Sequence, residues 1–316
     1  MKADPVLKRH LLIGLATAAA LSLTACGDSG SDDVAGPVAQ EPTTRSVTHF
    51  RGTTEVPAEP QRVVVLDLGE LHSAIALGVK PVGAVKAPVQ DGLLSYLSEQ
   101  AAGIELVGEI GEPNLEQIAA LEPDLILGSD VRVKDFYDEL SAIAPTVFTE
   151  TVGVDWKENL EIHAQALGRE QQAESLMAAY EARAVEVGEK VADDRTVSIV
   201  RFVPGEIRLY AQDNFIGTVL EDAGIARPEA QDVPEFSVTA SAEQIGLADG
   251  DEIFVGTYGD ASETDGPKVL GGPLWKRLPA VVAGDVHEVD DDIWFLGTGV
   301  GAADLVLDEL EETLAS

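Results

Sequence analysis

The sequence predicts an α/β protein in which two halves of alternating strands and helices flank one long helix. Three observations support this fold class. Short apolar runs alternate with helical segments up to about residue 155, a single apolar stripe with helical spacing then extends to residue 191, and the alternation resumes at residue 197. Alternation of this kind is typical of βα units that build a largely parallel sheet.

The first half begins with a buried strand. Residues 62–66, RVVVL, form an apolar run without helical spacing, as expected for a strand that is covered on both faces. The helix predicted at residues 71–77 ends at Gly78, a residue typical of helix C-termini, and residues 82–85 form the next strand. The alternation continues with a helix at 115–121, a strand at 125–128, a helix at 135–142 and a strand at 145–148.

The segment from Trp156 to Val191 has apolar residues at helical spacings. Gly168 is expected to divide it into two helices, because glycine is unfavourable inside a helix. The second helix, from about Glu170 to Val191, would be about 33 Å long at the usual rise per residue. It is therefore long enough to run the length of a lobe.

The second half returns to short strands and helices. A strand at 197–203, a turn at Pro204-Gly205 and a strand at 207–210 predict a hairpin. The predicted elements that follow are helices at 215–222 and 241–247, a strand at 253–257 and a final helix at 302–314.

One unit of the first half is repeated in the second. PNLEQIAALEPDLIL and SAEQIGLADGDEIF both contain Glu-Gln-Ile, and both have capping-box spacing, Asn114-x-x-Gln117 and Ser241-x-x-Gln244. Glu116 and Glu243 therefore occupy the same place in the first turn of a helix. The helix dipole alone favours a carboxylate there, so one of these glutamates by itself would indicate no function.

The N-terminus predicts export. Lys2, Lys8 and Arg9 precede an apolar run, residues 11–23, that is too short to span a bilayer comfortably, as in a signal peptide. The run ends in LTACG, which resembles the lipobox of bacterial lipoproteins. Cys26 is the only cysteine in the chain, and its position after the apolar run favours lipidation over a buried thiol. Residues 27–46 are small and polar, and are expected to form a flexible tether.

The charge of the chain argues against nucleic acid as a partner. The formal net charge is −35, with 56 acidic and 21 basic residues. A field of this sign repels phosphate backbones, and it would steer cations or large polar ligands only where local basic groups reverse it. Most of these carboxylates are expected to form a solvated surface.

Several segments in fixed order resemble one family. They are the lipobox, the tether, RVVVLDLG, ALGVKPVGAV, NLEQIAALEPDLILGS, LSAIAPTV, HAQALGREQQAESL, IGTVLEDAGI and GPLWKRLPAVVAGDVHEVDDDIWF. The chain resembles the substrate-binding lipoproteins of bacterial ABC importers, in the class that carries ferric siderophores, cobalamin and haem. The resemblance covers nearly the whole chain from Arg62 onward.

The resemblance implies two Rossmann-like lobes joined by one long, stiff helix, with the ligand in the cleft between them. The boundaries it suggests are a signal peptide at 1–25, lipidated Cys26 and the tether at 26–46, an N-terminal lobe at 47–155, a linking helical segment at 156–192 and a C-terminal lobe at 193–316. It also implies that Glu116 and Glu243, one on each lobe, dock onto arginines of the membrane permease. We expect a monomer that is anchored by lipid to the extracytoplasmic face of the cell membrane.

Candidate ligand-binding residues follow from the strand order, because open parallel sheets bind ligands beyond the carboxyl ends of their strands. A ferric siderophore presents anionic oxygens and an apolar periphery, which call for guanidinium groups and aromatic surfaces. Arg132 follows a predicted strand, with a plain surface charge as the alternative. Arg201 lies inside a strand and must face the cleft or a partner carboxylate, and the cleft is favoured. Arg208 would replace Arg201 in another strand register. The other candidates are Trp156, Tyr210, Asn214, Tyr258 and Trp294, each of which packing or a helix cap explains equally well.

The sequence offers little for a resident metal, a cofactor or catalysis. The five histidines lack metal-ligand spacing, Asp290–Asp292 is interpreted as a solvated acidic turn, and the glycine-rich run 297–301 as a turn into the last helix. No Gly-x-Ser-x-Gly motif or candidate catalytic cysteine occurs. We therefore expect no enzyme and no cofactor, with iron present only inside a bound siderophore.

The predicted function is capture of a ferric siderophore outside the cell and its delivery to an ABC permease. A cobalamin- or haem-binding protein of the same transporter class is the alternative, as is a surface lipoprotein without a transport role on the same fold. The sequence does not distinguish hydroxamate, catecholate and mixed siderophores.

Overall fold

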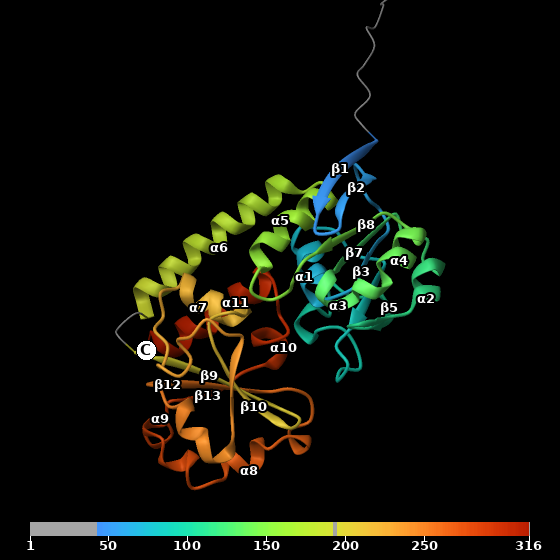
Figure 1. The fold of residues 1–316 in the computed structure, drawn as a ribbon. Helices are drawn as coiled ribbons and strands as arrows, with labels where there is room; N and C mark the ends of the chain where they lie inside the picture. The colour runs from blue at the N-terminus through green and yellow to red at the C-terminus, as the bar shows by residue number, and fades with distance from the viewer. Residues whose placement is uncertain (1–42, 192–194, 316) are drawn as a thin grey trace, which may run out of the picture. The chain divides into compact units, whose positions relative to one another are not determined.

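The computed structural model describes residues 43–191 and 195–315, which belong to one compact unit. Cys26 and the predicted signal peptide lie outside the described residues. Strands and helices alternate on both sides of a long helix, α6 (Glu170–Val191), as predicted (Figure 1). No helix among the described residues is long and apolar enough to cross a membrane.

The first half, up to residue 155, carries a six-stranded sheet with the order β6-β5-β4-β3-β7-β8. Its strands are parallel except for the β5–β6 pair. The elements of this half are β1 (Thr44–His49), β2 (Gly52–Pro57), β3 (Val63–Val65), α1 (Leu68–Ala76), β4 (Gly83–Lys86), η1 (Ser95–Leu97), β5 (Glu105–Glu109), β6 (Glu112–Pro113), α2 (Leu115–Ala120), β7 (Leu125–Ser129), α3 (Asp130–Val133), η2 (Lys134–Phe136), α4 (Tyr137–Ile143) and β8 (Thr146–Thr149).

The second half carries a five-stranded sheet with the order β11-β10-β9-β12-β13. Strands β9, β12 and β13 are parallel, whereas β10 pairs antiparallel with both β9 and β11. The elements are β9 (Val197–Val203), β10 (Glu206–Tyr210), α7 (Phe215–Asp222), β11 (Ser237–Ala240), η3 (Ala242–Ala248), β12 (Glu252–Thr257), η4 (Ala261–Glu263), α8 (Gly266–Leu270), η5 (Trp275–Arg277), α9 (Pro279–Ala283), β13 (Val286–Glu288), α10 (Asp291–Trp294) and α11 (Val300–Leu314).

Each sheet has an apolar cluster on both faces, which explains the uninterrupted apolar runs in the sequence. Along β3, Val63 and Val65 belong to one cluster and Val64 to the cluster on the opposite face, because side chains alternate along a strand. Along β9, Val197 and Ile199 face one cluster, whereas Val200 and Phe202 face the other. The odd-numbered face of β9 is the one that carries Arg201.

Helix α6 connects the apolar cores of the two halves. It follows α5 (Trp156–Leu167), which ends at Gly168 in the left-handed conformation with φ of 69°. Near its start Ala173 packs into a first-half cluster, and Tyr180 and Val187 further along pack into a second-half cluster. Burial at both ends anchors the helix in both halves.

The structure differs from the sequence predictions in a few places. The fold begins with a hairpin, β1–β2, so residues 44–46 are part of a strand and not of the predicted tether. The helix predicted at 135–142 is divided into η2 and α4, and the one predicted at 241–247 is the 3-10 helix η3. The short strands β5, β6, β11 and β13 were not predicted, since they carry few of the apolar residues that identify a buried strand.

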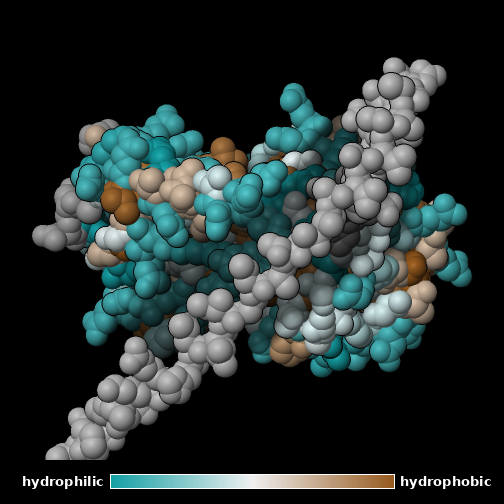
Figure 2. All heavy atoms as spheres, turned by 90° about the horizontal axis from the view of Figure 1, so that it is seen from above, coloured by the Kyte–Doolittle hydropathy of each residue, from teal (hydrophilic) through white to brown (hydrophobic). Residues whose placement is uncertain are grey.

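Hydrophilic residues cover most of the face shown in Figure 2 outside the grey atoms, and apolar residues appear there in small separate groups. This distribution agrees with an acidic, solvated surface.

Candidate ligand-binding cleft

A cleft of about 510 Å³ lies where the two halves meet. Its volume is within the range usual for small-molecule sites. The first half contributes Ala87 and Pro88 after β4, Ile110 after β5 and Arg132 on α3, and the second half contributes the remaining lining residues. These are Arg201, Val203, Pro204, Arg208, Tyr258 and Leu296. Three of the ten lining residues are arginines and none is acidic, so guanidinium groups line the cleft, although each of them pairs with a carboxylate next to the lining.

The register of the β9–β10 hairpin places two arginines on the same face of the sheet. Arg201 on β9 and Arg208 on β10 are direct cross-strand partners, and such partners project to the same side. The sequence had offered Arg208 only as a replacement for Arg201. Both line the cleft, and this part of the prediction was therefore wrong.

Arg201 is buried and fully ordered by its neighbours. Its Nε and Nη2 donate to the two carboxylate oxygens of Asp291 at 2.7 and 2.5 Å, and its Nη1 donates to the Tyr210 hydroxyl at 2.9 Å. The guanidinium also lies over the rings of Tyr258 and Phe295, 4.8 Å from each centroid. Burial by itself lowers the pKa of Arg201, but the bonds to Asp291 and Tyr210 outweigh it and raise that pKa.

Arg132 is held more loosely. Its Nε donates to Asp67 at 2.7 Å, and 41% of its side chain is exposed. Asp67 is itself buried and caps α1 by accepting a hydrogen bond from the Leu68 amide. Arg208 has a similar arrangement, with its Nε bonded to Glu206 at 2.7 Å.

The arrangement is suited to an anion. Among the described residues, Arg132 and Arg208 each donate only their Nε–H, which leaves both terminal amino groups of each guanidinium for a ligand. Guanidinium groups bind carboxylates and other planar anions through paired hydrogen bonds. The apolar lining residues, with the Tyr258 ring, would contact the organic part of such a ligand.

Two of the predicted aromatic contacts belong to the core. Trp156 is 3% exposed, packs edge-on against Tyr180 and donates its indole N–H to Thr218 at 2.9 Å. Trp294 is fully buried, stacks on Phe254 and donates its indole N–H to Glu309. Neither lines the cleft. The expectation that they contact the ligand was therefore wrong, and core packing is the explanation.

Tyr210 and Asn214 also do not line the cleft. Tyr210 is 4% exposed and supports Arg201 through its hydroxyl. Asn214 is buried as the N-cap of α7, where its side chain accepts from the Gly217 amide at 2.8 Å. The helix cap that the sequence had suggested as the alternative explains Asn214. Of the seven predicted contacts, Arg132, Arg201 and Tyr258 remain as cleft residues.

The acidic run at residues 290–292 was interpreted wrongly as a solvated turn. Asp291 forms the bidentate pair with Arg201, and Asp292 accepts from the Ser95 amide and hydroxyl at 2.9 and 2.8 Å. Asp290 caps α10. Asp292 thus joins the two halves beside the cleft. An arginine inside an apolar strand requires a partner carboxylate, and this requirement was the available signal for Asp291.

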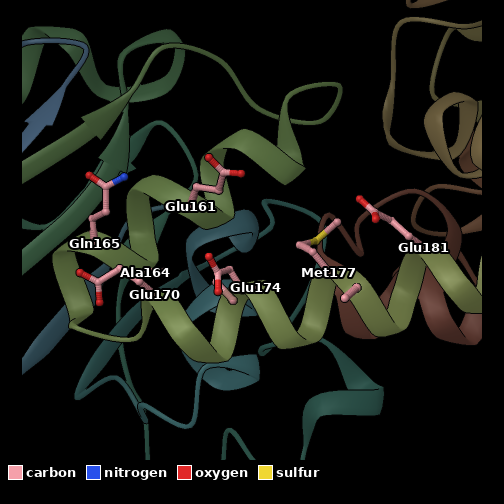
Figure 3. A pocket seen from close by; sticks show the side chains of 9 residues that line it. Glu161, Ala164, Gln165, Glu170, Glu174, Met177 and Glu181 are labelled. Atoms are coloured by element: carbon pink, nitrogen blue, oxygen red, sulfur yellow. The ribbon is translucent and has the colours of Figure 1, made fainter.

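A second groove lies between α5 and α6, on a surface away from the basic cleft. It has a volume of about 410 Å³ and an apolar floor that includes Met177. Figure 3 shows the glutamates around it, and these are Glu161, Glu170, Glu174 and Glu181. Because no basic residue lines this groove, it is not suited to an anionic ligand.

Glu116 and Glu243 are both exposed in the first turn of their helices, α2 and η3. Asn114 accepts from the Gln117 amide at 3.1 Å, which is half of the predicted capping box. At the second site Ser241 and Gln244 form the reciprocal box. The described residues contain no group of three or more potential metal ligands.

Comparison with known proteins places the chain in a family. The family model described as periplasmic binding protein matches residues 63–293. A probable siderophore-binding lipoprotein of Bacillus subtilis, YfiY, is 38% identical, over 96% of this chain and 98% of the relative. An achromobactin-binding periplasmic protein of Dickeya dadantii is 31% identical, over 79% of this chain and 85% of its own length.

A solved structure agrees with these relatives. The crystal structure of Staphylococcus aureus SirA complexed with staphyloferrin B has a TM-score of 0.78 and 34% sequence identity, and the match covers 86% of this chain and 98% of SirA. Since the family model spans most of the chain and the relatives are matched over most of their length, the chain belongs to the periplasmic binding protein family, as its motifs predicted.

Proposed function

We propose that this protein is the solute-binding protein of an ABC importer, which captures a ferric siderophore outside the cell and delivers it to the membrane permease. The observation that carries the proposal is the cleft with Arg132, Arg201 and Arg208 at the junction of the two halves. Ferric siderophores of the carboxylate type present anionic oxygens at their surface, which matches guanidinium donors.

The relatives support an anionic ferric ligand. SirA was crystallised with staphyloferrin B, and further relatives are named for achromobactin and ferric citrate. Haem is disfavoured, because the cleft lining contains no histidine, methionine or cysteine, and the ring of Tyr258, the one lining residue that could ligate haem iron, packs under Arg201. Cobalamin has no comparable need for three guanidinium groups.

The test is a binding titration. Quenching of the intrinsic tryptophan fluorescence is followed as ferric staphyloferrin B, ferric citrate, a ferric hydroxamate, a ferric catecholate, cobalamin and haem are added separately. We expect saturable quenching by at least one ferric carboxylate complex at the lowest concentration. Tighter binding of cobalamin or haem would contradict the proposed ligand class, and no response to any of these compounds would contradict the proposed function.

Membrane attachment and docking complete the proposal. We propose lipidation at Cys26, which would hold the protein at the extracytoplasmic face of the cell membrane, and docking of Glu116 and Glu243 on the permease. Support comes from the lipobox-like sequence, from relatives named as lipoproteins, and from the exposure of both glutamates.

A further inference from the structure

A small cavity with polar walls lies beneath α1, close to the Arg132 side of the cleft. Its lining comes from α1, from α5 and from the loop before α5, and Thr298 closes it from the second half of the chain. The lining residues are Gly69, Glu70, Ser73, Val152, Gly153, Trp156, Asn159, His163 and Thr298. The cavity volume of about 10 Å³ corresponds to roughly one water molecule.

Two buried side chains of this cavity have unused polar atoms. Glu70 is 1% exposed, and neither of its carboxyl oxygens has a hydrogen-bond partner among the described residues. His163 is also 1% exposed; its Nδ1 lies 2.9 Å from the Ser73 hydroxyl, but its Nε2 has no partner in the same set of residues. Leaving a buried polar atom without a hydrogen-bond partner is unfavourable, so two such groups lining one cavity indicate a bound molecule that bonds to both.

Glu70 lies close to a residue that binds a cleft arginine. It lies one helical turn after Asp67, which binds Arg132. Burial and the negative charge of Asp67 raise the pKa of Glu70 to about 8, against the lowering effect of the positive charge of Arg132. Burial lowers the pKa of His163 to about 3, so this imidazole is neutral at physiological pH.

The other charged groups around α1 have partners elsewhere or are exposed. On α5, Lys157 pairs with Asp222, and Glu158 and Glu161 are exposed. His72, on α1 itself, bonds to the Tyr96 hydroxyl, and burial lowers its pKa to about 4. On the packed elements, Lys86 of β4 pairs with Glu109, and Asp155 before α5 accepts from the Thr151 hydroxyl. Four carboxylates of α11, which also packs on α1, interact with Tyr180, Arg183, Lys190 or Trp294, and the fifth, Glu312, is exposed. The charges that act on Glu70 are those of Asp67 and Arg132, and His163 lines the same cavity.

We propose that Glu70, one buried water molecule and His163 form a proton-binding site behind the cleft, and that loss of the Glu70 proton to solvent weakens the binding of an anionic ligand at Arg132. The water would bridge the Glu70 carboxyl to Nε2 of His163. When the carboxyl loses its proton, the new negative charge opposes an anion at Arg132. By linkage, an anion bound at Arg132 must strengthen proton binding at Glu70 to the same extent.

The coupling to ligand affinity rests on the proposed function, whereas the proton site does not. The proton site is tested without ligand by ¹³C NMR of the whole chain labelled at glutamate carboxyl carbons, titrated from pH 4 to pH 9. We expect one resonance with a midpoint near pH 8 that is absent in Glu70→Gln. The control Glu99→Gln, at an exposed position, should remove a different resonance. If every glutamate resonance titrates below pH 6, the proposal is wrong.

The interaction between Arg132 and Glu70 can be measured without a siderophore, from the titration midpoint of Glu70. In Arg132→Ala, the Glu70 midpoint should move to higher pH, because a nearby positive charge that favours the ionised carboxyl has been removed. An unchanged midpoint would contradict the coupling. A crystal structure should contain a water about 2.8 Å from both Glu70 and Nε2 of His163, and a dry cavity would contradict the bridge.

The effect on binding is measured with ferric staphyloferrin B at pH 6.5 and pH 9 in the wild type, Glu70→Gln and Glu99→Gln. At each pH the affinity of the wild type is divided by that of Glu70→Gln. We expect this ratio to be about fivefold lower at pH 9 than at pH 6.5. The ionisation of the siderophore itself cancels in this ratio. If affinity depends on pH in the same way in all three proteins, Glu70 does not influence ligand binding and the coupling is refuted. If none of the three binds at either pH, the proposed ligand class is wrong. The NMR titration then still decides whether Glu70 is a proton-binding site.

Discussion

The two sides of the cleft hold their arginines in different ways. On the second-half side, Arg201 is 5% exposed, and Asp291, Tyr210 and two aromatic rings fix its guanidinium. On the first-half side, Arg132 is 41% exposed at its side chain and has one bond, to Asp67. The guanidinium on the second-half side is therefore held by several contacts, whereas the one on the first-half side has a single described hydrogen bond and is more exposed.

The largest effect on stability and ligand affinity is expected from substitution of Arg201, on the second-half side of the cleft. Arg201→Ala would leave Asp291 partly buried without its partner, and breaking such a pair costs about 3–5 kcal/mol of stability. The same change removes a fixed donor from the cleft, so affinity for the ferric ligand should fall by about 100-fold. Thermal unfolding and fluorescence titration measure the two effects. Arg201→Lys keeps the positive charge but lacks the paired guanidinium donors, so its stability and affinity should lie between those of the wild type and Arg201→Ala. If Arg201→Ala is as stable as the wild type, the ion pair with Asp291 does not stabilise the fold.

The next effect concerns stability on the first-half side. Glu70 keeps its proton in the folded state up to a pH of about 8, whereas in the unfolded chain it ionises near 4.5. Wild-type stability should therefore fall as pH rises between these values, by at most about 1.4 kcal/mol per pH unit, and level off above pH 8. The stability of Glu70→Gln does not decrease in this way, because glutamine does not ionise. The Tm of Glu70→Gln minus the Tm of the wild type should therefore increase from pH 5 to pH 8. A constant difference in Tm would show that Glu70 ionises normally.

A smaller effect is expected from Arg132→Ala. Arg132 is partly exposed but its partner Asp67 is buried, and Asp67 would retain only its hydrogen bond from the Leu68 amide, so stability should fall by about 1–3 kcal/mol. Affinity should fall by about tenfold through the loss of one guanidinium contact. Lys134→Ala removes a nearby positive charge that does not line the cleft, and it should leave affinity unchanged. If the two variants bind equally well, the first-half side takes no part in binding.

The smallest effect on binding is expected outside the cleft. Charge reversal at Glu116 and Glu243 together should leave ligand affinity unchanged, because both side chains are exposed and away from the cleft lining. Tm should fall only slightly, because the helix dipole favours a carboxylate in the first turn. Uptake of iron by cells that depend on this protein should nevertheless be lost. Reversal at Glu174 and Glu181 changes the net charge equally and should leave uptake intact. Normal uptake in the Glu116/Glu243 variant would refute docking through these residues.

Much of the fold was predictable because its signals are local. The apolar run at residues 62–66, the break at Gly168 and the stripe along residues 170–191 each identify an element from neighbouring residues. The strands that were missed, such as β5 and β11, are stabilised by pairing in a sheet and carry little apolar pattern of their own. Their existence depends on the neighbouring strands and not on their composition.

The candidate site was predictable only in part. The position of Arg132 and Tyr258 after strands, and of Arg201 inside one, identified three residues that line the cleft. Trp156 and Trp294 occupy similar positions in the sequence but are turned into the core. Sequence position places a backbone near a cleft, but the direction of a side chain depends on the packing around it.

The sequence by itself determined the order of the elements, the long helix between the halves, the family and the arginines that follow the strand pattern. The tertiary structure decided which arginines share a face, which carboxylates hold them and which glutamate is buried without a partner. The physical reason is distance along the chain: Arg201 and Asp291 are 90 residues apart, and Arg132 and Asp67 are 65 apart. Hydrophobic periodicity can be recognised from residues that are neighbours in the sequence, whereas burial and ion pairing arise only when distant segments pack together.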